Sequence, residues 1–290
     1  MTDHRTSGAR IKQCVAPFAL GADFSHEKGD IAIVPGFFIS YRNGWTFDDF
    51  CRMVSEIGIK GVDLIAPQYW PTLKKYGLLP TMPGLGTAGT PMDGIAAKEN
   101  HAKYECSTRA MLKQCSEYGA PNMVAMTGPP QGMSYEEAAD NTVDFLNTVK
   151  SQAEDQSVTI CLEILNAVDH PDYVFDHANW GFDVVKRVDS PRVKVLYDIY
   201  HSQIQDGDIV RTIRNNIDLI GHIHTAGNPG RRQIDSEQEL NYPFIAREIA
   251  KLRFTGYVGH EYMPQPDTHA LEDLKKAYEI FDLAIDGSLS

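Results

Sequence analysis

The chain has 290 residues, and 42% of them are hydrophobic. This is enough apolar material for a large core, so an intrinsically disordered protein and a small secreted scaffold are excluded. The 27 basic and 39 acidic residues give a formal net charge of −12. Such a charge argues against nucleic acid and membrane surfaces as partners, because an acidic protein surface repels both.

Cysteine usage and the N-terminal residues indicate the compartment. The five cysteines are scattered and form no C-x-x-C pair, which predicts buried thiols in a reducing compartment rather than a disulfide framework. The N-terminal stretch MTDHRTSGARIKQC lacks the apolar segment of a signal peptide, and no run of about 18 apolar residues predicts a membrane span. We therefore expect a cytoplasmic protein with a disordered tail over residues 1–10.

Eight short apolar runs alternate with longer amphipathic stretches along the chain, and no linker divides them. This alternation is typical of strand–helix units, and eight units predict an α/β protein with the (β/α)8 TIM barrel fold, as a single domain over residues 11–290. In chain order, the predicted strands are 11–16, 61–65, 78–81, 122–126, 158–163, 193–198, 219–224 and 256–261. The predicted helices are 46–57, 98–118, 134–154, 173–188, 209–215, 242–252 and 268–284.

Two stretches are too long to be simple connections between these elements. Residues 21–43 follow the first strand and could form an inserted hairpin, whereas residues 77–94 are rich in proline and glycine. Long loops in a compact domain are usually lids or binding loops. We expect long loops on the face where the strands end.

The last four predicted strands each end in a residue that can bind a divalent cation. These residues are Glu163, Asp198, His224 and Glu261, separated by 35, 26 and 37 residues. Each spacing accommodates one helix and its loops, and the strand ends of a barrel converge on one face, where active sites of this fold lie. A single acid at a strand end is more often a helix cap or a solvated loop residue, but four in succession favour a shared site.

The chemistry of this set indicates the ion. Three carboxylates and one imidazole form a hard, oxygen-rich site, which favours Mn²⁺, with Mg²⁺ or Co²⁺ as alternatives, over a closed structural zinc site. We therefore predict one divalent metal ion as the cofactor.

Three further residues are candidates for binding substrate. His201 follows Asp198 in a D-x-x-H turn, and Arg231 lies on the loop after His224, where its guanidinium could hold a carboxylate or hydroxyl groups. Trp70 is expected to open a loop after the second strand. The alternatives are a solvated histidine, a surface arginine and a tryptophan that only packs. His222, two residues before His224, is expected one layer deeper as a core histidine or as a donor behind the ligands.

Several segments resemble the xylose isomerase-like family of sugar isomerase and epimerase barrels, and in particular the hydroxypyruvate isomerase-like proteins. The resemblance rests on LEILNAVDHPDY, GHIHTAGNPGRRQIDSEQELNYPF, GYVGHEYMP and GIKGVDLIAPQYWPTLKKYGL. It implies a metal held by Glu163, Asp198, His224 and Glu261, proton exchange by the two glutamates, and substrate oxygens bound by His201 and Arg231. His224 departs from the glutamine that is usual in hydroxypyruvate isomerases and is similar to the histidine of ketose 3-epimerases.

The expected activity is proton transfer through an enediolate on a ketose or hydroxy-keto substrate. One glutamate moving a proton between adjacent carbons gives isomerisation, two glutamates on opposite faces of one carbon give epimerisation, and loss of water gives a lyase. The alternatives are a non-catalytic sugar-binding subunit and an AP endonuclease, although the acidic charge and the four-ligand set argue against the latter. The expected partners are a small-molecule substrate and further copies of the chain in a homo-oligomer.

Overall fold

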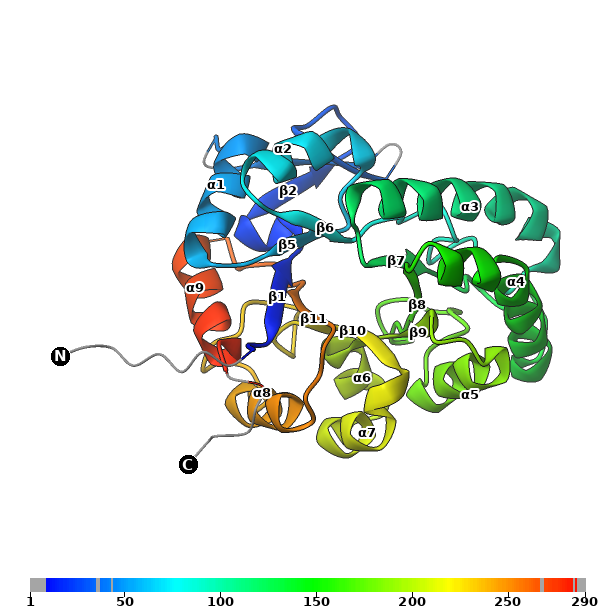
Figure 1. The fold of residues 1–290 in the computed structure, drawn as a ribbon. Coiled ribbons are helices and arrows are strands. Elements are labelled where there is room, and N and C mark those ends of the chain that lie inside the picture. Colours follow the sequence, from blue (N-terminus) through cyan, green and yellow to red (C-terminus); the bar gives the residue numbers. More distant parts are fainter. Residues whose placement is uncertain (1–8, 35–36, 43, 267–268, 284, 286–290) are drawn as a thin grey trace.

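The protein, described here by a computed structural model over residues 9–34, 37–42, 44–266, 269–283 and 285, is a barrel of eight parallel strands surrounded by helices (Figure 1). The predicted (β/α)8 fold is therefore confirmed. The hydrogen-bonded strand order is β6-β5-β1-β11-β10-β9-β8-β7, and the ring nearly closes between β6 and β7, where the Val124 N–H donates to the carbonyl of Pro83 over 3.0 Å. The strands are β1 (Lys12–Val15), β5 (Gly61–Asp63), β6 (Leu79–Met82), β7 (Asn122–Ala125), β8 (Thr159–Glu163), β9 (Val193–Asp198), β10 (Ile220–Thr225) and β11 (Tyr257–His260).

Each of the seven predicted helices is present, with some changes at the ends. They are α1 (Phe47–Ile57), α3 (His101–Tyr118), α4 (Tyr135–Asp155), α5 (Ala178–Val188), α7 (Ile209–Asn216), α8 (Tyr242–Lys251) and α9 (Ala270–Phe281). Ser134 caps α4 by accepting from the Glu137 N–H. A complete capping box lies at the start of α1, where Thr46 and Asp49 bond one another reciprocally.

Three helix predictions are corrected. Helix α5 begins at Ala178 rather than at residue 173, because the Val174 N–H and the Phe175 carbonyl bond neighbouring loops instead. The expected D-x-x-H turn after Asp198 is a helix, α6 (Ile199–Gln205), and the expected loop at Trp70 is also a helix, α2 (Trp70–Lys75). Both helices are short, so their apolar periodicity is a weak sequence signal.

The stretch after β1 is an insertion with a sheet of its own. The strands β2 (Ala22–Ser25), β3 (Ile31–Val34) and β4 (Phe37–Tyr41) form an antiparallel sheet in the order β2-β4-β3. The insertion therefore contains three strands, one more than the expected hairpin. This sheet and the loop after β6 both reach the cavity described below, as expected for long loops at the C-terminal ends of the strands.

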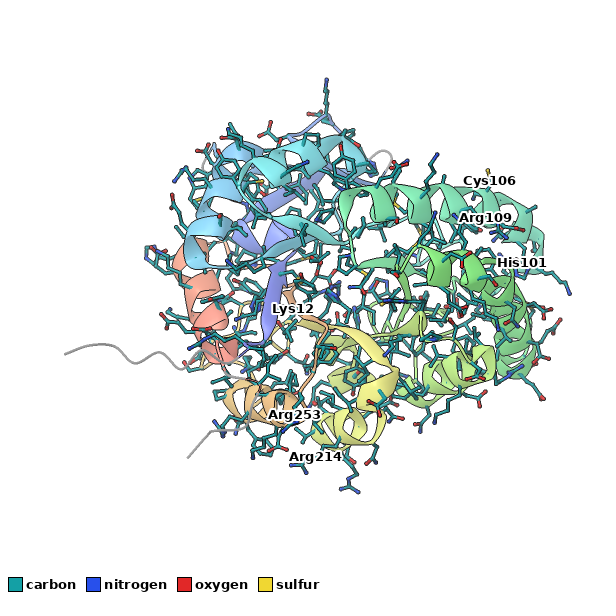
Figure 2. The ribbon with its side chains drawn as sticks, viewed as in Figure 1. Lys12, His101, Cys106, Arg109, Arg214 and Arg253 are labelled. Atoms are coloured by element: carbon teal, nitrogen blue, oxygen red, sulfur yellow. The ribbon has the colours of Figure 1, made fainter. Side chains whose placement is uncertain are left out.

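Two expectations about the termini and thiols change. Residues 1–8 lie outside the described residues, but Ala9 and Arg10 of the expected tail are held: the Ala9 carbonyl accepts from the Ile285 N–H, and Arg10 pairs with Asp282 at 2.7 Å. All five cysteines are free, and four are buried as expected, whereas Cys106 is exposed on α3 (Figure 2). Within the described residues, no helix is both long enough and apolar enough to cross a membrane.

Candidate active site

The four predicted ligands come together at the C-terminal ends of their strands. One ligand atom from each of Glu163, Asp198, His224 and Glu261 can be chosen so that all four lie within 4.8 Å of one another. The register of the barrel places them there, because His224 on β10 is paired with Asp198 on β9 and with Gly259 on β11, two residues before Glu261. We call these four residues the mouth cluster.

The mouth cluster contains buried polar atoms without hydrogen-bond partners. Asp198 Oδ2, His224 Nδ1 and Glu261 Oε2 are all buried and make no hydrogen bond, although Glu261 Oε2 lies within ion-pair distance of His224 Nδ1 and Arg231 Nη2. His224 Nδ1 lies only 2.9 Å from Glu261 Oε2 and 3.5 Å from Glu163 Oε1. Unpaired buried polar atoms are rare in folded proteins, so their convergence on one point, with oxygen and nitrogen donors, fits a bound divalent cation.

Asp198 has two functions, one for each carboxylate oxygen. Its Oδ1 caps α6 by accepting from the N–H groups of Tyr200 and His201, at 2.7 and 3.2 Å. Its Oδ2 faces the mouth cluster and is unpaired. The helix-cap alternative is therefore correct for one oxygen, while the other oxygen can still act as a ligand.

Burial and mutual repulsion set the protonation of the cluster. Burial, together with the neighbouring Glu261 carboxylate, raises the pKa of Asp198 to about 7, and burial also raises the pKa of Glu163. Burial opposes charge on His224 as well, but the neighbouring carboxylates of Glu261, Asp63 and Glu163 hold the pKa of His224 well above its ordinary value. Without a cation, the cluster therefore keeps protons that a cation would displace.

Arg231 belongs to the same site, as the sequence predicts. Its Nη2 lies 2.8 Å from Glu261 Oε2 and 3.9 Å from Asp198 Oδ2. Burial favours the neutral form of Glu261, but Arg231 and His224 hold the pKa of that carboxyl below its ordinary value. The Arg231 backbone has a φ of +52°, and its carbonyl accepts from the Met263 N–H at 2.7 Å. This contact ties the loop to the segment that follows β11.

His201 is buried beside the cluster rather than solvated in a loop. Its Nδ1 lies 3.1 Å from the Asn166 N–H and 2.6 Å from Asn166 Nδ2, which leaves Nε2 unpaired at 3.8 Å from Asp198 Oδ2. Burial and the nearby Arg231 charge lower the pKa of His201 well below its ordinary value. A neutral imidazole therefore faces the site.

Trp70 does not lie at the site. Its side chain is buried, its indole N–H donates to the Ile65 carbonyl at 3.1 Å, and its ring packs on Tyr118. It is absent from the residues that line the cavity above the mouth cluster. The structure thus favours packing for this residue, because α2 holds it against α3 and away from the strand ends.

A cavity of about 710 Å³ lies above the mouth cluster. Of the four cluster residues, Glu163 and Glu261 line it, together with Arg231 and His170. The rest of the wall is mostly apolar and comes from the inserted sheet, the loop after β6 and the segment after β11; it includes Phe24, Ile33, Leu85, Met92 and Met263. The polar floor and apolar walls describe a pocket for an organic molecule with one polar, metal-binding end.

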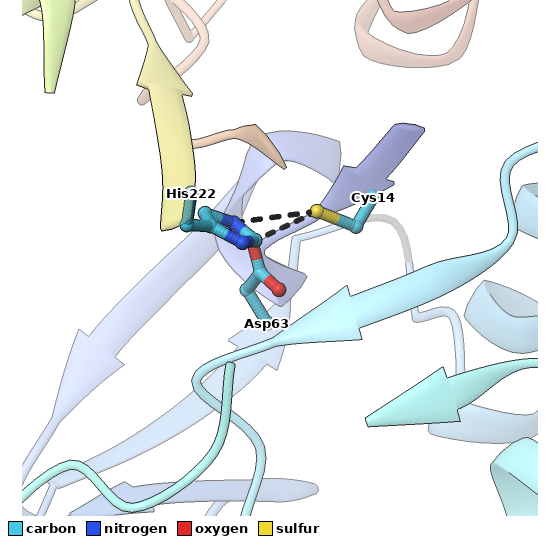
Figure 3. Close-up of side chains that lie close together, drawn as sticks. All are labelled: Cys14, Asp63 and His222. Carbon is cyan, nitrogen blue, oxygen red and sulfur yellow. Dashed lines mark hydrogen bonds and ion pairs between the residues drawn. The ribbon is translucent and has the colours of Figure 1, made fainter. Parts of the chain in front are cut away.

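A second group of ligand-type residues lies next to the mouth cluster. Cys14 on β1, Asp63 on β5 and His222 on β10 converge inside the barrel (Figure 3). The expectation that His222 is a buried core histidine is confirmed, and its Nε2 lies 2.9 Å from Asp63 Oδ2. Asp63 and Cys14 were not predicted, although an acid at the end of the second strand, in KGVDLI, is the same kind of signal that revealed the other four.

Comparisons with known proteins agree with this fold. The model of a family described as xylose isomerase-like TIM barrel matches residues 51–280. The chain is 27% identical over 237 residues to 2-oxo-tetronate isomerase of Pectobacterium atrosepticum, covering 77% of this chain and 88% of that protein. It is 29% identical over 141 residues to hydroxypyruvate isomerase of Escherichia coli, covering 49% and 54%.

Solved structures share the architecture. An AP endonuclease of family 2 from Brucella melitensis superimposes with a TM-score of 0.76 at 22% identity, covering 94% of this chain and 100% of that one. A 3-keto-D-glucoside 4-epimerase from E. coli gives a TM-score of 0.66 at 21% identity, covering 80% and 92%. At these identities the likeness concerns the fold alone.

Proposed function

Because the chain belongs to the xylose isomerase-like TIM barrel family, we propose that it is a metal-dependent isomerase or epimerase acting on a ketose or another hydroxy-ketone. The observation that carries this proposal is the double placement of Glu163 and Glu261, which belong to the mouth cluster and also line the cavity. Relatives named 2-oxo-tetronate isomerase and hydroxypyruvate isomerase support the reaction class.

The proposed cofactor is one Mn²⁺ ion, with Mg²⁺ or Co²⁺ as alternatives, held by Glu163, Asp198, His224 and Glu261. A divalent cation there would polarise the carbonyl of a hydroxy-ketone and stabilise the negative charge of the enediolate. The unpaired atoms of the cluster support this ligand set. Oligomerisation and a cytoplasmic location stay predictions from the sequence.

The two glutamates would move the proton. They extend from β8 and from the end of β11, which are separated in the barrel by β9 and β10, so they would approach the substrate from two sides. One carboxylate would take the proton from the carbon beside the carbonyl. Its return to the adjacent carbon by the same group gives isomerisation, whereas delivery by the other glutamate to the opposite face gives epimerisation.

The cavity favours a substrate larger than a three-carbon acid. Its volume of about 710 Å³ is larger than hydroxypyruvate needs, and its walls offer more apolar surface than this small acid can contact. Arg231, the residue that could bind the carboxylate of hydroxypyruvate, is already paired with Glu261. We therefore propose a neutral hydroxy-ketone, whose hydroxyl or carbonyl oxygens would contact Arg231. The neutral His201 is buried beside Asp198 and is not among the residues that line the cavity.

Proton NMR in deuterated water tests the proposal. The Mn²⁺-loaded enzyme is incubated with a panel of ketoses, inososes and hydroxypyruvate, and the ion is removed before the spectra are recorded. Deuterium at the carbon next to the carbonyl, with an isomer or epimer as product, is expected. Loss of water from the substrate would instead identify a lyase, and metal binding without exchange on any substrate would identify a sugar-binding accessory protein.

A further inference from the structure

Asp63 is a buried carboxylate that takes no part in the proposed proton transfer. It lies at the end of β5, below the mouth cluster, with no exposed surface. Its Oδ1 accepts from the Thr81 hydroxyl at 2.5 Å, and its Oδ2 accepts from the Cys14 thiol at 3.0 Å. The same Oδ2 lies 2.9 Å from His222 Nε2 and 3.2 Å from His224 Nε2. One charged group therefore connects four side chains from three strands, β1, β6 and β10.

The contact with His224 determines how that imidazole presents its two nitrogens. A proton on Nε2 is required for donation to Asp63, because a carboxylate oxygen only accepts. The opposite nitrogen, Nδ1, makes no hydrogen bond and lies between Glu261 and Glu163. A neutral His224 held in this way has its lone pair on Nδ1, directed at the centre of the mouth cluster. Metal-binding histidines are commonly oriented by such a carboxylate.

Two glycines make room for this arrangement. A Cβ at Gly259 on β11 would lie 2.4 Å from Asp63 Oδ2 and 2.9 Å from His224 Cδ2, closer than real Cβ contacts allow. A Cβ at Gly61 on β5 would lie 2.2 Å from Thr81 Cγ2. The approach of Asp63 to His224 and to Thr81 therefore depends on positions without a side chain, and this evidence is independent of the hydrogen bonds.

The remaining contacts of Asp63 distinguish a hydrogen-bonded network from a second metal site. No side-chain atom of Cys14, Asp63 or His222 is among the unpaired buried polar atoms of the described residues. His222 Nδ1 lies 3.5 Å from Asn122 Nδ2, so the other ring nitrogen, Nε2, carries the proton that is donated to Asp63. The group is complete without a cation, in contrast to the mouth cluster.

We propose that Asp63 is a positioning residue that holds His224 with Nδ1 toward the metal of the mouth cluster. Its carboxylate selects the tautomer and the ring orientation of His224, while Cys14, Thr81 and His222 hold Asp63 itself. This inference rests on the proposed metal site, and it assigns Asp63 no direct contact with substrate.

Metal titration of two variants tests the proposal. Asp63→Asn keeps the size of the side chain and removes the charge, and its Mn²⁺ affinity, measured by calorimetry, is expected to fall about 10- to 100-fold. Cys14→Ser is the matched control, because the serine hydroxyl can still donate to Asp63 Oδ2 and the charge of Asp63 is kept; its affinity should stay within about threefold of the parent. Equal affinity in Asp63→Asn and the parent would overturn the proposal. Failure of the parent itself to bind Mn²⁺ would instead refute the metal site.

Nitrogen-15 NMR of labelled histidines provides a test in the unaltered protein, which holds even if Asp63→Asn does not fold. The protein is loaded with Zn²⁺ as a diamagnetic substitute, and His224 is assigned by its absence from His224→Gln. We expect the Nε2 resonance of His224 to be that of a hydrogen-bonded N–H, and the chemical shift of its Nδ1 to be changed by the bound metal. A proton on Nδ1, or a second Zn²⁺ equivalent that disappears in Cys14→Ser, would overturn the proposal.

Discussion

The mouth cluster and the inner cluster, defined as Cys14, Asp63 and His222, contain similar residue types at neighbouring levels of one barrel. Both are buried and both bring carboxylate and imidazole groups within bonding distance. In the inner cluster every side-chain polar atom has a hydrogen-bond partner. In the mouth cluster Asp198 Oδ2, His224 Nδ1 and Glu261 Oε2 make no hydrogen bond, and Glu261 Oε2 has only ion pairs with His224 and Arg231.

This difference shows that residue type alone does not identify a ligand site. A buried polar group without a partner is costly, so it persists where a ligand or a catalytic need compensates. A fully bonded group needs no ligand, because its donors and acceptors satisfy one another. The comparison therefore supports the proposal that the mouth cluster binds a metal and the inner cluster supports it, and four measurements can contradict or refine it.

The largest effect is expected from Asp198→Ala. This change removes the unpaired Oδ2 from the mouth cluster and should abolish Mn²⁺ binding, and with it turnover. It also removes the cap of α6, which costs about 1 kcal/mol of stability. Asp198→Asn separates the two effects, since asparagine still caps the helix. If elemental analysis found full metal occupancy in the folded Asp198→Ala variant, Asp198 would not be a ligand.

The second effect concerns Glu261→Gln. Glutamine keeps an oxygen for the metal but cannot accept the substrate proton, so solvent-deuterium exchange should fall at least about 100-fold while weakened metal binding persists. Glu136→Gln, on the exposed start of α4, is the control for the same substitution. Exchange at the parent rate in Glu261→Gln would reduce Glu261 to a ligand and require another base.

A third effect is the pH dependence of metal binding. The pKa of Asp198 is raised to about 7 by burial and by Glu261, and only the ionised carboxylate binds a cation. Protons therefore compete with Mn²⁺ as the pH falls below 7, and affinity should decrease by up to about tenfold per pH unit for each proton displaced. Calorimetry in buffers of different ionisation enthalpy counts those protons. A flat affinity between pH 5 and pH 7, the roughly two-unit range below this pKa, would contradict the assignment.

The smallest effect is expected from Arg231→Lys. Lysine keeps the positive charge near Glu261 but loses the planar fork of donors, so we expect the KM for a neutral ketose to rise less than about tenfold, with turnover retained. Steady-state kinetics on a ketose and on hydroxypyruvate provide the comparison. Efficient hydroxypyruvate turnover that collapses in this variant would indicate a carboxylate substrate bound by Arg231.

Local sequence patterns predicted most of the helices and strands, because the apolar runs and the apolar spacing that mark them recur along the chain. Each strand is a short apolar run, and long helices such as α4 carry a capping residue and several turns of apolar spacing. The short helices α2 and α6 were missed, since six or seven residues present too few periods to detect. The placement of Trp70 failed for the same reason, as a residue assigned to a loop proved to be part of a helix packed on α3.

The sequence by itself determined the barrel, the acidic character and the four strand-end residues of the mouth cluster, because parallel strands bring their ends to one face whatever the details of packing. Only the tertiary structure decided which polar atoms are paired. Asp63 and His224 are 161 positions apart, and their contact depends on the register of β10 with β11 and on the missing side chain of Gly259. Hydrogen bonding between distant strands leaves no local pattern, so the difference between the two clusters appears only when the barrel is closed.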